Sequence, residues 1–133
     1  MPAFPSESWA AQFQQAINAN EAYAEAAAAW EGDFILEVLD DPAAEKGPGI
    51  YLDLAHGKCR EARFLPDATT VSSEFVFRGS RENWTKLMRG EVEPVKAFLD
   101  GTIKLKGNPM KAMRFARAAK ELIETAARIP ADP

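Results

Sequence analysis

Residues 50–65, IYLDLAHGKCREARFL, predict two antiparallel strands joined by a tight turn. Apolar side chains recur at alternate positions from Ile50 to Leu54, which is typical of a strand with one buried face. His56-Gly57 then indicates a hairpin turn, because glycine adopts positive φ without strain. The arm after the turn alternates more weakly. We expect the rest of the sheet to form around this hairpin.

Further strands are predicted on both sides of the hairpin. Phe34, Leu36 and Val38 alternate with their neighbours before it, and residues 71–77 alternate after it. Short turns separate these runs, so the four strands are expected to form an antiparallel meander. Residues 103–106 predict a short fifth strand.

Helices are predicted before and after the strands. Each of four helices is preceded by a side chain that commonly caps a helix start: Ser6, Asn20, Ser80 and Asn108. In the first helix, Trp9, Phe13 and Ile17 recur every four residues and form one apolar stripe. The last helix, from Pro109 toward Pro130, is predicted to be continuous and amphipathic.

The length of 133 residues suits one domain, which we place at residues 6–129 between tails at 1–5 and 130–133. The single cysteine, Cys59, excludes an intramolecular disulfide and a zinc site built from several cysteines. No run of about 18 uncharged apolar residues is present, and the first residues lack the basic start and apolar core of a secretory signal. We therefore expect a cytoplasmic protein.

Charge is unevenly distributed along the chain. Residues 1–57 hold ten acidic side chains and one basic side chain, whereas residues 101–133 hold seven basic and three acidic ones. The acidic half opposes polyanions, so nucleic acid is not an expected partner. The basic residues of the last helix form either its solvated side or a collar for an anionic head group or a membrane surface.

The sequence shows no catalytic constellation. His56 is the only histidine, and its place in a turn favours a solvent-facing side chain. A nucleophile–base pair of Cys59 and His56 across a tight turn has poor geometry, and the strand pattern makes Cys59 a packing residue. No phosphate-binding glycine loop and no set of metal ligands occurs. We expect no enzymatic activity, no cofactor and no metal.

One stretch resembles a known family. Residues 79–90 read GSRENWTKLMRG, residues 98–101 read FLDG and residues 102–108 read TIKLKGN. This order of a tryptophan-containing helix ending in glycine, a second helix ending in glycine, a strand with lysine at alternate positions and a final helix resembles sterol carrier protein type 2 domains. The resemblance extends from about Ser6 over nearly the whole chain. Asn108 stands where the family often has aspartate, and the chain has no peroxisomal Ser-Lys-Leu, so we expect the free-standing cytoplasmic kind.

The resemblance implies an α+β fold, in which helices cover a five-stranded, mostly antiparallel sheet and an apolar tunnel lies between sheet and helices. It also implies non-enzymatic binding, and transfer, of a lipid such as a fatty acid, a fatty acyl-CoA or a sterol-like molecule. The residues that we expect to line the tunnel are Phe75, Phe77, Trp84, Leu87, Met88, Phe98, Ile103, Leu105, Met110 and Met113. The basic residues that we expect to meet a head group at the entrance are Lys104, Lys106, Lys111 and Arg114.

Two other hypotheses stay open at this point. The same fold could be an accessory module that presents a hydrophobic intermediate to a partner enzyme, or that dimerises through an apolar face. A small hydrolase or transferase using Cys59 with His56, or a carboxylate, is the third hypothesis. Monomer and homodimer are both compatible with the sequence, and any membrane contact is expected to be transient.

Overall fold

The computed structural model describes residues 4–40 and 44–129. The predicted tails fall largely outside these residues, so the proposed division of the chain stays a prediction. The cytoplasmic location also stays a prediction. Within the described residues, every helix is too short or too polar to cross a membrane.

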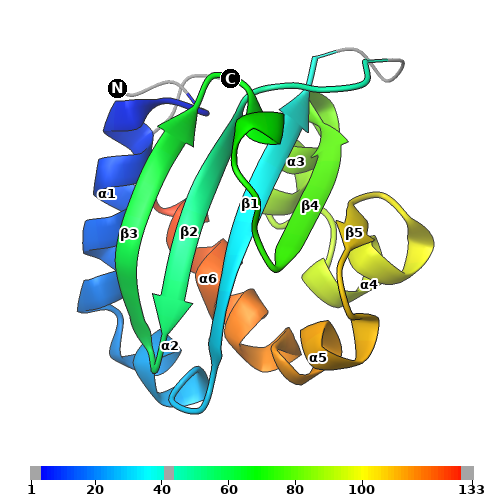
Figure 1. The fold of residues 1–133 in the computed structure, drawn as a ribbon. Helices are drawn as coiled ribbons and strands as arrows, with labels where there is room; N and C mark the ends of the chain where they lie inside the picture. Colours follow the sequence, from blue (N-terminus) through cyan, green and yellow to red (C-terminus); the bar gives the residue numbers. More distant parts are fainter. Residues whose placement is uncertain (1–3, 41–43, 130–133) are drawn as a thin grey trace.

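Five strands form one sheet in the order β3-β2-β1-β4-β5 (Figure 1). The strands are β1 (Glu31–Leu39), β2 (Gly49–Ala55), β3 (Lys58–Leu65), β4 (Phe75–Ser80) and β5 (Lys104–Lys106). Neighbouring strands are antiparallel except for β1 and β4, which are parallel. The predicted α+β class with a mostly antiparallel sheet is confirmed, and so is the central hairpin, whose turn has positive φ at both His56 and Gly57.

The predicted meander is wrong in its last strand. β4 pairs with β1 and not with β3, and it begins at Phe75 instead of Val71. Residues 66–74, which include the short 3-10 helix η1 (Ala68–Thr70), carry the chain across the open face of the sheet (Figure 1). Hairpin loops usually have roughly two to five residues, and the observed link is longer than that because β4 begins only at Phe75.

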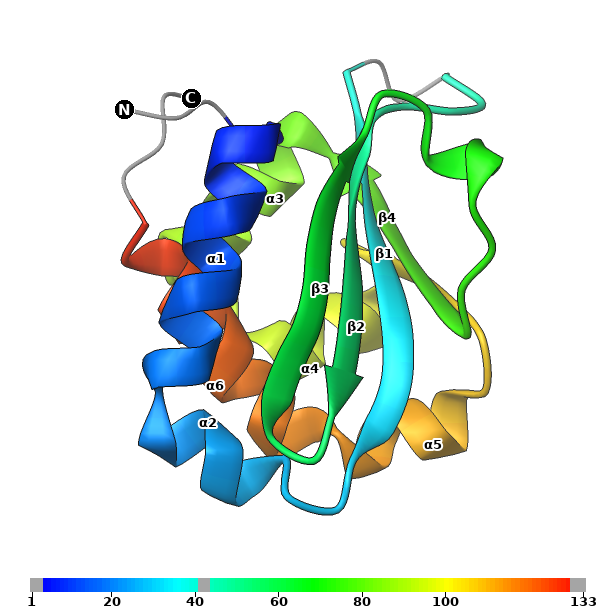
Figure 2. The same cartoon turned by 60° about the vertical axis from the view of Figure 1, so that its left-hand side comes forward.

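Helices α1, α3 and α6 lie on the other face of the sheet (Figure 2). The helices are α1 (Glu7–Ala19), α2 (Glu21–Ala26), α3 (Arg81–Met88), α4 (Pro94–Asp100), α5 (Pro109–Arg114) and α6 (Ala116–Ala127). The four predicted capping side chains each accept a hydrogen bond from a backbone N–H in the first turn of their helix. Trp9, Phe13 and Ile17 are buried, which confirms the apolar stripe of α1.

The last helix is not continuous as predicted but breaks at Phe115 into α5 and α6. The backbone N–H of Phe115 donates to the carbonyl of Ala112 at 3.0 Å, which tightens the turn at the break. The Phe115 ring is buried against aromatic side chains of the sheet, and α5 has no buried residue of its own. The break therefore lets Phe115 enter the core while α5 remains at the surface.

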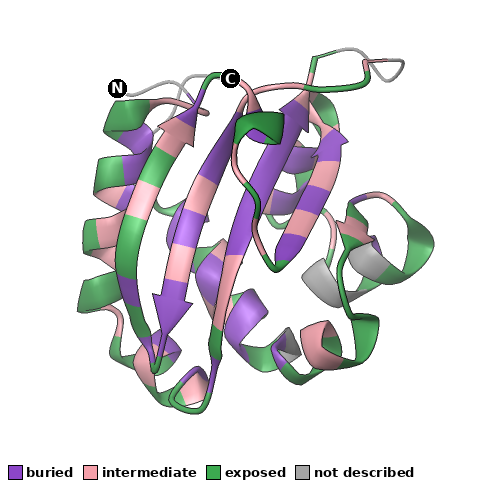
Figure 3. Cartoon of the chain, viewed as in Figure 1, coloured by how far each residue is buried: buried purple, intermediate pink, exposed green. Residues whose placement is uncertain are grey.

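Burial alternates along β4, which has one face toward the helices, whereas β1 is buried continuously from Phe34 to Val38 (Figure 3). The larger core lies between sheet and helices and includes Phe34, Leu52 and Phe75. A smaller group on the open face, built on Ile35 and Leu65, packs under η1. The helix-side core is therefore the part of the fold that adjoins the site described next.

Candidate functional site

A crevice of about 490 Å³ opens where the end of α2, the start of β1 and the junction of α5 with α6 meet. We call it the Trp30 crevice, and it is lined by Ala26, Ala29, Trp30, Glu31, Lys111, Arg114, Phe115 and Ala118. Its volume falls within the roughly 300–1,000 Å³ of small-molecule sites. Most of its lining is apolar, and its charged residues come from only two elements.

Small side chains create the space in the crevice. Ala26 and Ala29 belong to the alanine-rich run at the end of α2, and Ala118 lies on α6. Alanine has high helix propensity but no side chain beyond Cβ. The helices therefore form while the volume between them stays open. The sequence already shows this feature, because the run Ala26–Ala29 is followed directly by Trp30.

Aromatic rings form the floor of the crevice. The Trp30 ring stacks on Phe34 with 5.6 Å between centroids and 9° between planes, and its centroid lies 4.4 Å from that of Phe115. Phe75 completes the cluster at 5.7 Å from Trp30. The indole Nε1 of Trp30 is buried without a hydrogen-bond partner in the described residues. The floor is thus apolar, with a donor that no described residue uses.

The rim of the crevice carries two basic side chains, Lys111 and Arg114, and one carboxylate, Glu31, which pairs with His56. Lys111 Nζ lies 2.7 Å from Glu74 Oε2 and 3.1 Å from the carbonyl oxygen of Glu31, and it stands 5.2 Å from the centroid of the Trp30 ring. Arg114 is exposed and forms no ion pair with any described residue. Within the described part of the chain, the rim therefore offers one held cation and one unpaired cation beside an apolar floor.

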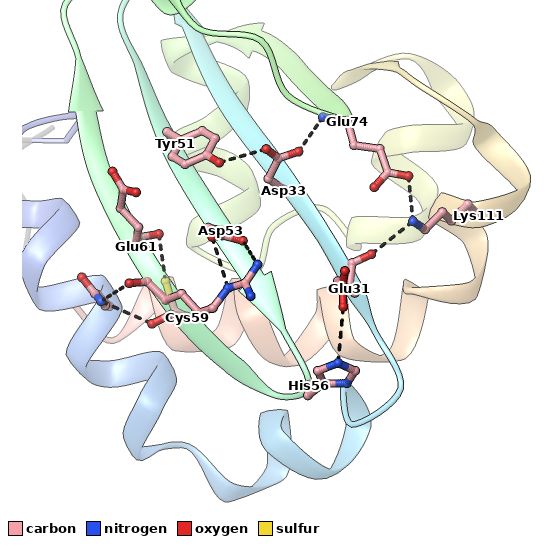
Figure 4. Close-up of polar contacts among 11 residues, drawn as sticks. Glu31, Asp33, Tyr51, Asp53, His56, Cys59, Glu61, Glu74 and Lys111 are labelled. Atoms are coloured by element: carbon pink, nitrogen blue, oxygen red, sulfur yellow. Dashed lines mark hydrogen bonds and ion pairs between the residues drawn. The ribbon is translucent and has the colours of Figure 1, made fainter.

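On the open face, Lys111 also borders a polar depression of about 350 Å³ (Figure 4). There the Tyr51 hydroxyl donates to Asp33 Oδ2 at 2.9 Å, and Arg60 pairs with Asp53 at 2.9 Å. Burial and the hydrogen bond to Asp33 raise the pKa of Tyr51 to about 12. Among the described residues, no three side chains of the metal-ligating types are grouped to hold an ion. The charged groups here pair with one another and form a structural network that lines the depression.

Cys59 and His56 do not form a nucleophile–base pair. His56 Nε2 lies 3.4 Å from Glu31 Oε2, whereas the Cys59 thiol donates to the carbonyl of Glu61 at 3.3 Å (Figure 4). Cys59 is buried, and that burial raises the pKa of its thiol to about 12. A thiol with this pKa is not ionised at neutral pH and is a poor nucleophile. The geometry gives the hydrolase hypothesis no support from this pair.

The structure places the ten predicted lining residues in three settings. Those buried in the helix-side core are Phe75, Phe77, Trp84, Leu87 and Ile103. Met88 and Leu105 are partly buried, whereas Met110 and Met113 are exposed on α5. The side chain of Phe98 lies outside the described part of the chain. None of the ten is among the residues that line the Trp30 crevice.

The four predicted head-group residues divide into two pairs. Lys111 and Arg114 lie together at the rim of the Trp30 crevice. Lys104 and Lys106 lie on the edge strand β5, and Lys106 borders a different depression on the open face, of about 600 Å³. Sequence reasoning missed Trp30 and Phe115 as site residues.

Comparisons with known proteins agree with this fold. A family model described as the SCP-2 sterol transfer family matches residues 12–120. The crystal structure of a sterol carrier protein 2 is 34% identical with a TM-score of 0.85, and the match covers 94% of this chain and 98% of that one. The solution structure of a conserved hypothetical protein from Thermus thermophilus, described as possibly a sterol carrier protein, is also 34% identical, with a TM-score of 0.84 and coverage of 96% and 90%.

A UbiJ ubiquinone synthesis protein shares 13% identity with a TM-score of 0.55, covering 88% of this chain and 93% of that one, which shows a common fold alone. A comparison with curated protein sequences finds no match.

Proposed function

The chain belongs to the SCP-2 sterol transfer family, and from this premise we propose that it binds and carries a lipid without catalysing a reaction on it. We further propose that the lipid enters at the Trp30 crevice. The single observation that carries this proposal is the combination, in one crevice, of an aromatic floor and a rim with two cations. Hydrocarbon binding is non-directional and worth about 0.8 kcal/mol for each methylene buried.

The rim favours a lipid with an anionic head over an uncharged sterol. Arg114 has no ionic partner in the described residues, and Lys111 could exchange its contact with Glu74 for one with a bound carboxylate or phosphate. Fatty acids and fatty acyl-CoA molecules have such a head.

The predicted tunnel remains part of this proposal. Phe75 belongs to the same aromatic cluster as Trp30 and Phe115, and Phe77 lies 5.4 Å from the Phe34 ring. A long acyl chain would reach these rings if the Phe115 side chain moved at the break between α5 and α6. We propose that the buried predicted residues form the inner wall for the chain end.

Ligand titration tests the proposed function. Delipidated protein is titrated calorimetrically with palmitate, palmitoyl-CoA and cholesterol. We expect it to bind the first two with Kd values of about 1 μM. This value follows when the cost of ordering the acyl chain is subtracted from the free energy gained by burying its methylenes. Palmitate at a free concentration of 100 times Kd should then stabilise the fold by about 2.7 kcal/mol. Absence of binding and of thermal stabilisation with all three ligands would contradict the proposal.

The basic rim gives a second prediction. Exchanging Lys111 and Arg114 together for glutamine should weaken palmitate binding about tenfold, because two charge-assisted contacts at a partly exposed site are lost. Binding of uncharged 1-hexadecanol should not change. The matched control is Lys58→Gln with Lys120→Gln, which removes the same charge from exposed positions outside the crevice. Equal losses in both double variants would show only a general charge effect.

The alternative to carriage is presentation of the lipid to a partner enzyme. Presentation also requires that the crevice bind the lipid. A transfer assay separates the two roles. Palmitate that moves between donor and acceptor vesicles with the purified chain alone supports carriage, whereas palmitate that leaves only on addition of another protein supports presentation.

A further inference from the structure

The most exposed large apolar side chains of the described residues all lie in one segment. Leu99 and Met110 are each 73% exposed, and Met113 is 48% exposed. Met110 and Met113 are three residues apart on α5, so they share one side of that helix. Isolated apolar side chains are common on surfaces, but three that are confined to 15 consecutive residues form a local feature.

The same segment is strongly basic. Residues 99–117 hold five basic side chains and one acidic side chain, although the whole chain has a net charge of −4. The basic residues are Lys104, Lys106, Lys111, Arg114 and Arg117. Only Lys111 is held in an ion pair with a described residue. Asp100, the one acidic residue, accepts hydrogen bonds from the backbone N–H and the hydroxyl of Thr102 within its own turn.

We propose that the 99–117 segment docks on the surface of an anionic lipid bilayer. Figure 1 shows α4, β5 and α5 together beyond β4, so the segment forms one end of the molecule. Methionine and leucine side chains can enter the interface, while lysine and arginine bury their methylene stems and keep their charges at the phosphate level. Docking itself needs no ligand in the Trp30 crevice, but it would bring the Lys111–Arg114 rim to the membrane.

Charge complementarity selects this occupant over a second copy of the chain. A two-fold dimer through the segment would place two surfaces of the same positive sign against each other, which opposes association. It also selects this segment over α1, which packs on β3 at the opposite edge of the sheet (Figure 1). Residues 1–45 contain no lysine or arginine, and α1 exposes Glu7, so an anionic bilayer would repel that edge.

Vesicle co-sedimentation of the full chain tests the proposal, with delipidated protein and no added ligand. The probes are vesicles of phosphatidylcholine alone and of phosphatidylcholine with about one-third phosphatidylglycerol. We expect binding to the anionic vesicles only, lost as salt rises from about 50 mM to 500 mM. Lys104→Gln with Lys106→Gln should lower the partition coefficient about thirtyfold, and Met110→Ser with Met113→Ser about tenfold. Lys58→Gln with Arg63→Gln, on the opposite edge strand, should leave it unchanged.

Three results would overturn the proposal. The first is equal binding to neutral and anionic vesicles, and the second is unchanged binding of the methionine double variant. The third is no binding by a folded protein at low salt, in which case sedimentation equilibrium would report whether a second copy covers the segment. Because no ligand is present, failure of vesicle binding and failure of palmitate binding are separate results, and neither implies the other.

Discussion

Gly57→Ala should lower the free energy of unfolding by about 3 kcal/mol, which corresponds to a fall in Tm of about 10 °C for a chain of this size. Two effects combine at this position. Gly57 has a φ of +81°, a backbone conformation that costs an L side chain energy. In addition, a Cβ atom there would lie 2.6 Å from the carbonyl oxygen and 2.8 Å from the Cα of Ala24, so the backbone of α2 would have to move.

Gly101→Ala is the matched control, because it separates the two effects. Gly101 has the same φ of +81°, but no atom lies within 4 Å of the position of its Cβ. We expect a loss of about 1 kcal/mol from the backbone conformation alone. Chemical denaturation of both variants measures the difference, which is the cost of moving α2. Equal losses of unfolding free energy in the two variants would show that α2 moves at no measurable cost. The hairpin turn would then not be held by close packing on Ala24.

Local sequence signals predicted most of the fold because they depend on neighbouring residues only. A side-chain oxygen at Ser80 or Asn108 reaches the next turn of backbone wherever the helix packs. Alternation from Ile50 to Leu54 likewise determines which face of a strand is apolar. These signals survived unchanged in the structure, and the family resemblance placed them in the right order.

Signals that depend on distant contacts were not readable in the same way. The pairing of β4 with β1 is set by which surfaces meet across the whole sheet, and alternation in β4 is the same for either neighbour. The break at Phe115 follows from the rings of Trp30 and Phe34, which lie 4.4 Å and 5.1 Å from it but more than 80 residues earlier. Helix periodicity alone favoured one continuous helix, because Phe115 also fits its apolar side.

The candidate site was half predictable for a related reason. Basic residues at a helix start are visible in the sequence, and Lys111 and Arg114 were named from it. The floor of the crevice could not be predicted, because the same large apolar residue types occur in a core and in the floor of a crevice. Phe75 and Trp84 are fully enclosed, whereas Trp30 borders open volume where alanines line the crevice. The small side chains around a space define it, so the alanine run was the sequence signal that indicated the crevice.

Filling the Trp30 crevice should have the largest effect on ligand binding. Ala26→Phe places a ring in the volume beside Trp30 and should displace about four methylenes of a bound chain. At about 0.8 kcal/mol for each methylene, the loss is ~3 kcal/mol, or about a hundredfold in the Kd for palmitate. Ala26 is only partly buried and faces open space, so the free energy of unfolding should change by less than about 1.5 kcal/mol.

Ala22→Phe is the control, since it adds the same ring at an exposed position of the same helix, away from the crevice. It should leave the calorimetric Kd for palmitate unchanged. Should Ala26→Phe fold poorly, Ala26→Leu adds less volume and should still weaken binding about tenfold. If palmitate binds both phenylalanine variants as tightly as the wild type, the acyl chain lies elsewhere. The enclosed residues around Phe77 and Leu87 would then be the site, reached by a larger opening between sheet and helices than the Trp30 crevice provides.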